Sequence, residues 1–197
     1  GRCSECKKPI SIRYPVVELA TAALFFFCVQ RWGATPAGLA WCTFCALLVA
    51  LALIDWDTTL LPDDLTLPLL WAGLLAAALQ WTATPLLDAV LGAAAGYVSL
   101  WAVYWGFKLV TGKEGMGYGD FKLLARLGAG GGWQTLPLTI RLSSLVGAVL
   151  GVIMLRLRNA ETSTPIPFGP YLAIAGWIAL LWGEQITASY LQIAGFK

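Results

Sequence analysis

The stretch FCALLVALALIDWDTTLLPDD, residues 44–64, decides the fold class of this chain. Its first part, residues 44–54, is an unbroken apolar run, and Asp55 follows directly. Apolar runs recur along the chain, and several approach the ~20 residues that an α-helix needs to cross a bilayer. A carboxylate at the end of such a run is costly near hydrocarbon. An ionisable residue at that place is therefore a candidate for function.

The composition supports the same class. Hydrophobic residues make up 58% of the chain and charged residues 12%, which is about half the charged share of a soluble domain. The net charge of +2 is too small to suggest a nucleic-acid partner. Apolar segments lie at about 16–30, 37–55, 65–81, 86–107, 120–133, 134–155 and 167–183. The sequence predicts an all-α polytopic membrane protein with about seven spanning or partly spanning helices, embedded in a lipid bilayer.

The basic residues predict the orientation, because Lys and Arg in short loops favour the cytoplasmic side. If the N-terminus is cytoplasmic, most of them fall inside and two fall outside. The inside set is Arg2, Lys7, Lys8, Arg13, Lys108, Lys113, Lys122, Arg156 and Arg158, and the outside set is Arg31 and Lys197. The first fifteen residues have neither the apolar core nor the cleavage site of a signal peptide. They begin abruptly, so we expect further residues upstream of Gly1.

A second carboxylate falls on the same side of the membrane. The motif GYGD, residues 117–120, opens the fifth apolar segment with Asp120, and the predicted topology brings Asp120 to the depth of Asp55. The chain contains no histidine, which excludes Ser-His-Asp and Cys-His arrangements and a histidine-based zinc protease. Two facing carboxyls can still hydrolyse a bond, because one keeps its proton. The ionised carboxyl takes a proton from water, and the neutral one hydrogen-bonds the scissile carbonyl.

The glycines of this motif have a use in such a site. Without a Cβ atom, Gly117 and Gly119 allow the backbone and a substrate to approach closely. The motif alone is a weak signal, however, and Asp120 taken alone fits a helix N-cap equally well. The acidic residues of the polar stretch 57–64 fit solvated loop charges, and Asp63 fits a cap of the third apolar segment.

The stretch PIPFGPY, residues 165–171, precedes the last apolar segment on the same predicted side. One interpretation is a helix start with a rigid approach, since proline suits the first turn. The other is an irregular segment lining a water-accessible site, which is tolerated at membrane depth only beside such a cavity. In that case Pro167, Phe168, Gly169 and Pro170 contact the substrate, and free carbonyls hold it extended.

Four separate motifs together indicate a family. ALIDWDTTLLPD, GMGYGDFKLLARLG, PIPFGPYLAIAGW and RCSECKKPISIRYPVVE closely resemble the type IV prepilin peptidases, which are GxGD intramembrane aspartyl proteases. The resemblance covers nearly the whole chain. It implies a multi-pass protein of the bacterial inner membrane whose active site faces the cytoplasm. Its substrates are prepilins or pseudopilins, from which it removes a short leader after a glycine. The catalytic aspartates of the family match Asp55 and Asp120.

The resemblance also bears on cofactors and domains. Many members methylate the new N-terminus with S-adenosylmethionine, so this cofactor is expected if methyl transfer is retained. Cys3 and Cys6 have zinc-ligand spacing, but two thiolates are half of a tetrahedral structural site, and larger members carry a second pair upstream. We therefore predict a remnant of a cytoplasmic Cys-x-x-Cys domain at 1–15 and a membrane-embedded peptidase domain at 16–197. Cys28, Cys42 and Cys45 are expected to be small buried residues.

Two other functions fit the intramembrane carboxylates. A proton- or ion-coupled transporter is the main alternative, although it would be expected to show an inverted repeat or paired broken helices, and no internal repeat is visible. A non-catalytic structural protein of pilus export is the third. Arg126 and Arg141 stand where the family is expected to have small or aliphatic residues. Arg126 would act on Asp120 if it turned inward, and Arg141 could reach outward to the interface or pair with an acid.

Overall fold

The computed structural model describes residues 1, 4–112, 115–158 and 167–193. Its helices are α1 Arg13–Trp32, α2 Pro36–Thr58, α3 Asp63–Ala78, α4 Leu86–Thr111, α5 Tyr118–Gly131, α6 Leu136–Arg158 and α7 Gly169–Ile193, with a short 3-10 turn η1 at Trp133–Thr135. Each α-helix coincides with one of the apolar segments read from the sequence. The prediction of an all-α membrane protein is confirmed.

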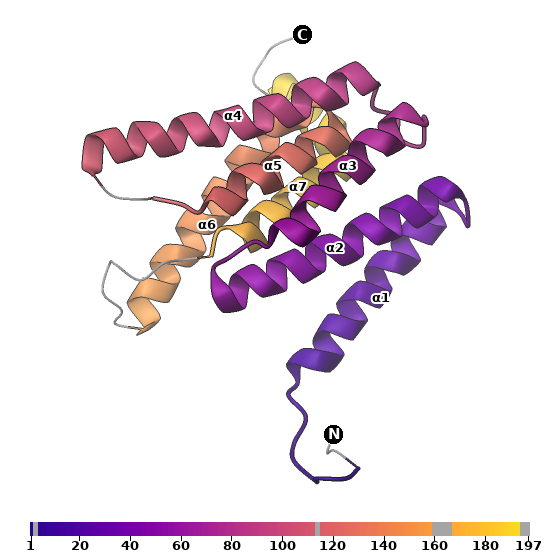
Figure 1. Cartoon of the computed structure of the whole chain (residues 1–197), viewed down its shortest axis with the longest axis vertical. Coiled ribbons are helices and arrows are strands. Elements are labelled where there is room, and N and C mark those ends of the chain that lie inside the picture. Colours follow the sequence, from indigo (N-terminus) through magenta and orange to yellow (C-terminus); the bar gives the residue numbers. More distant parts are fainter. Residues whose placement is uncertain (2–3, 113–114, 159–166, 194–197) are drawn as a thin grey trace. The chain divides into compact units, whose positions relative to one another are not determined.

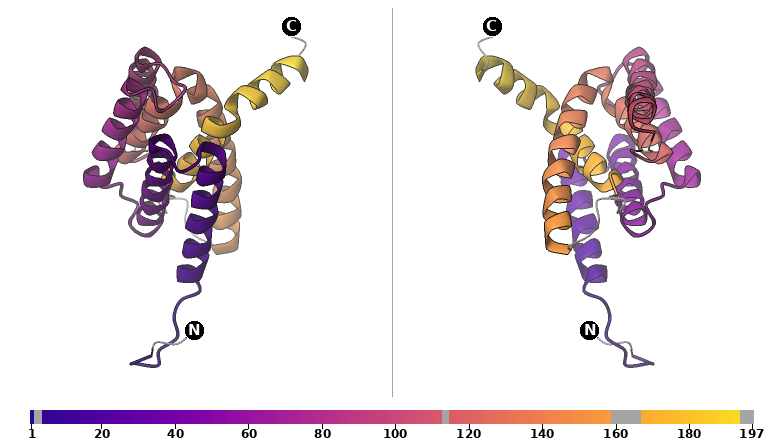
Figure 2. Two further views of the ribbon diagram at one scale, coloured as in Figure 1. Left: turned by 90° about the vertical axis from the view of Figure 1, so that its right-hand side faces the viewer. Right: turned by 90° about the vertical axis from the view of Figure 1, so that its left-hand side faces the viewer.

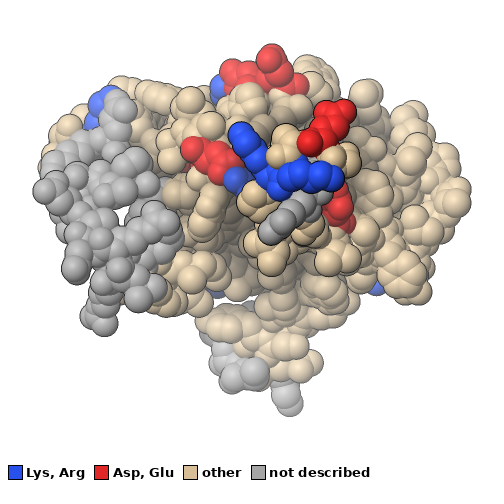
Figure 3. Space-filling view, turned by 90° about the horizontal axis from the view of Figure 1, so that it is seen from below, with Lys and Arg blue, Asp and Glu red and all other residues tan. Residues whose placement is uncertain are grey.

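Three of the described helices, α1, α2 and α4, are long and apolar enough to cross a membrane. By contrast, α3 has 16 residues and α5 has 14, so both are shorter than a full span. Most of the surface seen in Figure 3 is uncharged. Exposed apolar side chains such as Leu109 and Val110 on α4, 80% and 86% accessible, suit contact with lipid.

The chain divides into two compact units, residues 1–49 and 50–197. In the first unit, α1 and the beginning of α2 are joined through residues 33–35 and pack on each other. Trp32 stacks on Trp41 with ring centroids 4.7 Å apart, and the Sγ atoms of Cys28 and Cys45 lie 3.7 Å apart. Cys28, Cys42 and Cys45 are all buried, which confirms the expectation for these cysteines.

In the second unit, α5 packs against α3, α4 and α7 (Figure 1). Helix α6 packs against α7, and the two cross in the side views (Figure 2). Nearly every residue of α5 from Asp120 to Ala129 is buried, although the helix is too short to span a bilayer. Helix α5 is therefore the enclosed element of this unit, and its neighbours determine where Asp120 lies.

Glycines let α4 and α5 approach closely. A Cβ atom on Gly96 of α4 would lie 2.7 Å from the carbonyl oxygen of Leu124, and one on Gly92 would lie 2.8 Å from the carbonyl carbon of Gly128. Membrane helices commonly use small residues in this way, because packing replaces the missing hydrophobic drive. The glycine-rich run GAGGGW, residues 128–133, thus begins with a contact between two helix backbones.

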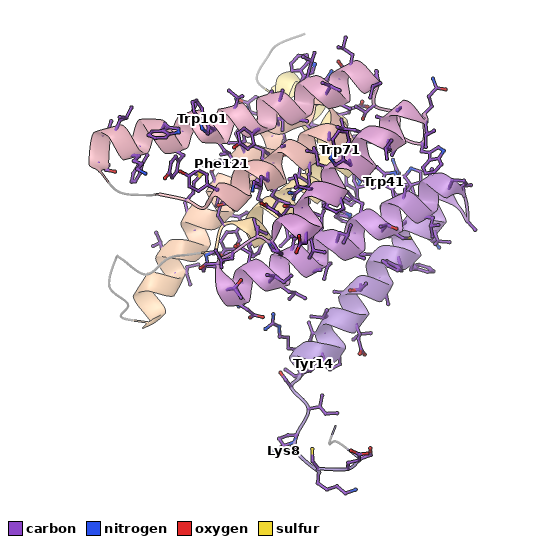
Figure 4. All side chains as sticks on the ribbon, in the orientation of Figure 1. Lys8, Tyr14, Trp41, Trp71, Trp101 and Phe121 are labelled. Carbon is purple, nitrogen blue, oxygen red and sulfur yellow. The ribbon has the colours of Figure 1, made fainter. Side chains whose placement is uncertain are left out.

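Aromatic side chains join the end of α4 to the start of α5. Phe121 is fully buried, and its ring centroid lies 5.5 Å from that of Tyr104 and 5.6 Å from that of Tyr118 (Figure 4). The Tyr118 hydroxyl donates to the Tyr104 hydroxyl over 3.3 Å. Lys108 donates to the same hydroxyl over 3.2 Å. These contacts anchor the first turn of α5, in which Asp120 lies.

Candidate active site

Asp55 lies in the last turn of α2, in the second unit, and its side chain is only 4% exposed. The helix ends three residues later, where Thr59 adopts a positive φ of 53°. The backbone N–H of Gly169 donates to Oδ2 of Asp55 over 2.9 Å. Asp55 is therefore held at the end of α2 by a buried residue of another helix.

Asp120 is the third residue of α5 and is 5% exposed. Gly117, in an extended conformation, is the N-cap of this helix, so the interpretation of Asp120 as the cap is wrong. The backbone of Gly117 interacts with the Asp120 carboxyl, and the charge of Asp55 acts on it as well. The structure thus brings the two predicted aspartates together across 65 positions of sequence.

The two glycines of the GYGD motif differ in their surroundings. A Cβ atom on Gly119 would lie 2.5 Å from Cβ of Leu61. Leu61 belongs to the connection between α2 and α3, so Gly119 lets that connection pack on the first turn of α5. A Cβ on Gly117 would lie 3.8 Å from Oδ2 of Asp120, which is an ordinary contact. A side chain at position 117 would therefore not clash with the Asp120 carboxyl, and the glycine leaves open space beside it.

An ion pair joins the starts of α3 and α5. Lys122 Nζ lies 2.6 Å from Oδ1 of Asp63, and the Thr66 hydroxyl donates to the same oxygen over 3.2 Å. Asp63 is exposed at the first turn of α3, and the hydrogen bond from Lys122 lowers its pKa. Asp63 is the first residue of α3 and Pro62 is its N-cap, so the prediction of a cap at Asp63 was wrong by one residue.

Helix α7 begins at Gly169, inside the stretch 165–171 for which an irregular backbone was one interpretation. Pro167 and Phe168 are partly buried and non-helical, while Gly169 and Pro170 already belong to α7 and are buried. The Phe168 carbonyl accepts the Leu172 amide over 3.1 Å, so it is not free to hold a substrate. The structure thus shows a helix start at Gly169, while the substrate contacts predicted for this stretch stay a prediction. Pro165 and the residue after it lie outside the described residues.

The side chain of Arg126 interacts with Asp63 rather than with Asp120. It is 1% exposed and lies on the α5 face that carries Lys122 one turn earlier, towards α3. Asp63 is the acid whose charge acts on it. Among the described residues, Nε and Nη1 of Arg126 have no hydrogen-bond partner. The other unusual arginine, Arg141, is exposed on α6.

The predicted zinc ligands lie in the first unit. Cys3 falls outside the described residues, and Cys6 is an exposed free thiol. Within the described part of the chain, no group of three or more cysteine, aspartate or glutamate side chains is arranged to hold a metal ion.

Sequence reasoning missed the contact between Gly169 and Asp55, because 114 positions separate the two residues. A signal was present in the sequence. PIPFGP, residues 165–170, contains no Ser, Thr, Asp or Asn that could cap the following helix. A helix that starts in a buried place without its own cap must find an acceptor elsewhere.

Comparisons with known proteins agree with the geometry. The model of the type IV leader peptidase family matches residues 42–152, and that of the bacterial peptidase A24 N-terminal domain matches residues 1–32. A prepilin leader peptidase/N-methyltransferase of Pseudomonas aeruginosa is 66% identical over 197 residues, which is 100% of this chain and 68% of that protein. The proteins of the same name from Stutzerimonas stutzeri and Xanthomonas campestris are 62% and 51% identical; each match covers at least 98% of this chain and 67% and 68% of those proteins. No solved structure matches. With more than half of its length matched by the family model and close relatives along its whole length, the chain belongs to the type IV leader peptidase family.

Proposed function

We propose that this chain is a prepilin leader peptidase, an intramembrane aspartyl endopeptidase whose catalytic pair is Asp55 and Asp120. The observation that carries the proposal is that two buried carboxyls, one from α2 and one from α5, lie near enough for the charge of Asp55 to act on Asp120. The family supports it, since the relatives are prepilin leader peptidases. The absence of histidine excludes the serine and cysteine protease arrangements that use a histidine base.

The chemistry follows from two carboxyls that share one proton. A water molecule between them attacks the carbonyl carbon of the scissile peptide bond, and the ionised carboxylate takes a proton from that water. The neutral carboxyl gives its proton to the carbonyl oxygen, so that a neutral gem-diol forms. The leaving nitrogen then takes the proton held by the pair as the C–N bond breaks, and a hydroxyl of the gem-diol gives its proton to one carboxylate. The products are a carboxylic acid and a free amine, and the pair again holds one proton. No metal ion or other cofactor takes part in these steps.

The substrate we propose is a prepilin or pseudopilin, which reaches the site from the bilayer. Gly117 lies beside Asp120, and Pro167 and Phe168 directly precede Gly169, whose N–H binds Asp55. We propose that these three residues line the substrate's path, with Gly119 and Pro170 shaping the backbone around it. Gly117 contributes open space beside Asp120. The substrate must be extended at the scissile bond, because a helical peptide bond is shielded by its own hydrogen bonds.

We propose that the site faces the cytoplasm and that the protein lies in the inner membrane. The ends of α2 and α4 and the starts of α3, α5 and α7 meet around Asp55 and Asp120, and Lys108 and Lys122 lie at that end. Basic residues favour the cytoplasmic side. In cells, a membrane-impermeant maleimide would label a cysteine placed at exposed Leu60 only after the inner membrane is opened, in a background without the native cysteines.

Methyl transfer and zinc binding are separate proposals. The names of the relatives include N-methyltransferase activity, and transfer of labelled methyl from S-adenosylmethionine to cleaved pilin measures it here. We expect this chain to cleave better than it methylates. A structural zinc ion would need Cys3 and Cys6 together with ligands from outside the described residues, so no step is assigned to it.

The deciding experiment is incubation of the purified chain in detergent with a prepilin, followed by mass analysis. Peptidase function predicts a shortened pilin and a released leader. An intact prepilin would instead favour the structural protein. The transporter finds no support in the family, since its members are peptidases.

A further inference from the structure

Helix α7 begins without a capping side chain of its own. The residue before it is Phe168, whose side chain accepts no hydrogen bond, and the second residue of the helix is Pro170, which has no N–H. Gly169 is buried, and a buried backbone N–H without an acceptor is costly. Its acceptor is Oδ2 of Asp55, at 2.9 Å. A catalytic carboxylate thus caps the start of a distant helix.

Position 169 also has no room for a side chain. A Cβ atom there would lie 2.7 Å from Oδ2 of Asp55, 3.0 Å from its Cγ and 3.3 Å from its Cβ. The first of these distances is shorter than real Cβ contacts, so the carboxyl or the start of α7 would have to move. Because residue 169 is a glycine, the start of α7 can lie directly against the Asp55 carboxyl. This short distance also permits the hydrogen bond from the Gly169 N–H to Oδ2 of Asp55.

We infer that Gly169 is a positioning residue for the aspartate pair, an inference that rests on the proposed peptidase function. Its N–H holds Oδ2 of Asp55, so Oδ1 is the oxygen left to meet water and Asp120. A carboxyl at the end of a helix could otherwise turn about its side-chain bonds and present either oxygen. A hydrogen bond from an N–H group to a carboxylate is stronger than one between neutral groups. The hydrogen bond from Gly169 therefore orients the Asp55 carboxyl. The start of α7 is then the third element of the active site.

The first test is Gly169→Ala in the full chain, with Gly183→Ala as the matched control on the same helix. A Cβ on Gly183 meets only Leu138 Cδ2 at 3.8 Å and Thr135 Cγ2 at 4.0 Å, so this change should leave kcat and KM as they are. Gly169→Ala displaces the carboxyl, and a misplacement of about 1 Å can cost about 10²-fold in rate. We expect kcat to fall by about that factor, while KM for prepilin and the unfolding temperature stay near those of the Gly183→Ala control.

Two results would overturn the inference. One is a kcat equal to that of the control. The other is an effect confined to KM, which would make position 169 a substrate contact. A parent chain that cleaves no prepilin at all would instead refute the proposed function, so the two failures are distinguishable.

A second variant separates the hydrogen bond from the steric effect and serves if Gly169→Ala fails to fold. Incorporation of glycolic acid at position 169 replaces the amide by an ester, which removes the N–H and adds no atom at Cα. Loss of a hydrogen bond to a charged group predicts a fall in kcat of about tenfold or more. KM should again be unchanged. An ester variant with the kcat of the parent chain would show that the N–H does not position Asp55.

Discussion

Gly96→Ala probes a close contact between the backbones of α4 and α5. Its new Cβ atom would lie 2.7 Å from the carbonyl oxygen of Leu124, whereas non-bonded heavy atoms prefer roughly 3.5 Å. The two helices must therefore separate locally by about 1 Å, because both contacting groups belong to rigid helix backbones. Overpacking of this kind costs about 1–3 kcal/mol in the free energy of unfolding. Leu124 lies one turn beyond Asp120, so the displacement should also reach the proposed catalytic pair.

The control is Gly106→Ala on the same helix, where an added Cβ meets nothing within 4 Å. Glycine to alanine in a helix interior without a clash stabilises by about 0.5–1 kcal/mol. The two variants are chemically identical, so their difference in unfolding free energy reports the helix contact alone. Thermal unfolding in detergent should place Gly96→Ala below the parent chain and Gly106→Ala at or above it, by about 2–4 °C per kcal/mol.

Cleavage of prepilin adds a second measurement. A shift of about 1 Å in the position of Asp120 predicts a fall in kcat of up to about 10²-fold for Gly96→Ala, with little change for Gly106→Ala. If Gly96→Ala is as stable and as active as Gly106→Ala, the close packing of α4 on α5 does not position the active site.

Further predictions concern charged residues. Asp55→Asn and Asp120→Asn should each lower the cleavage rate by at least about 10²–10⁴-fold in a folded protein, whereas Asp57→Asn, at an exposed position, should retain activity; substantial turnover by either member of the pair would refute the assignment. The cleavage rate should have a bell-shaped dependence on pH, because one carboxyl must be neutral and the other ionised, and a flat profile would contradict a shared proton. Arg126→Met should raise the free energy of unfolding by about 1–3 kcal/mol, because it removes a buried guanidinium whose Nε and Nη1 find no hydrogen-bond partner among the described residues; a lower unfolding temperature would show that the attraction of Asp63 outweighs the cost of burying the charge.

Much of this protein is determined locally by its sequence. The apolar runs fix seven helices, since a segment in lipid must satisfy its backbone hydrogen bonds within itself. The order of these helices is enough to place Asp55 and Asp120 at the same end, because each lies beside a polar connection on the same predicted side. The sequence also suggests the chemistry, because its motifs resemble those of a family of aspartyl proteases and the chain has no histidine to serve as a base.

Only the tertiary structure decides how the site is held. The direction of Arg126 depends on which helix covers its face of α5. That helix is α3, and the acid that acts on Arg126 is Asp63 of α3 rather than Asp55 or Asp120. The bond from Gly169 to Asp55 depends on two helix ends meeting in space. The sequence cannot supply these facts, because helix periodicity specifies which residues share a face but not which helix covers it. Packing of rigid helices makes that choice, and here it places the amide of Gly169 against a carboxylate oxygen of Asp55, a proposed catalytic residue.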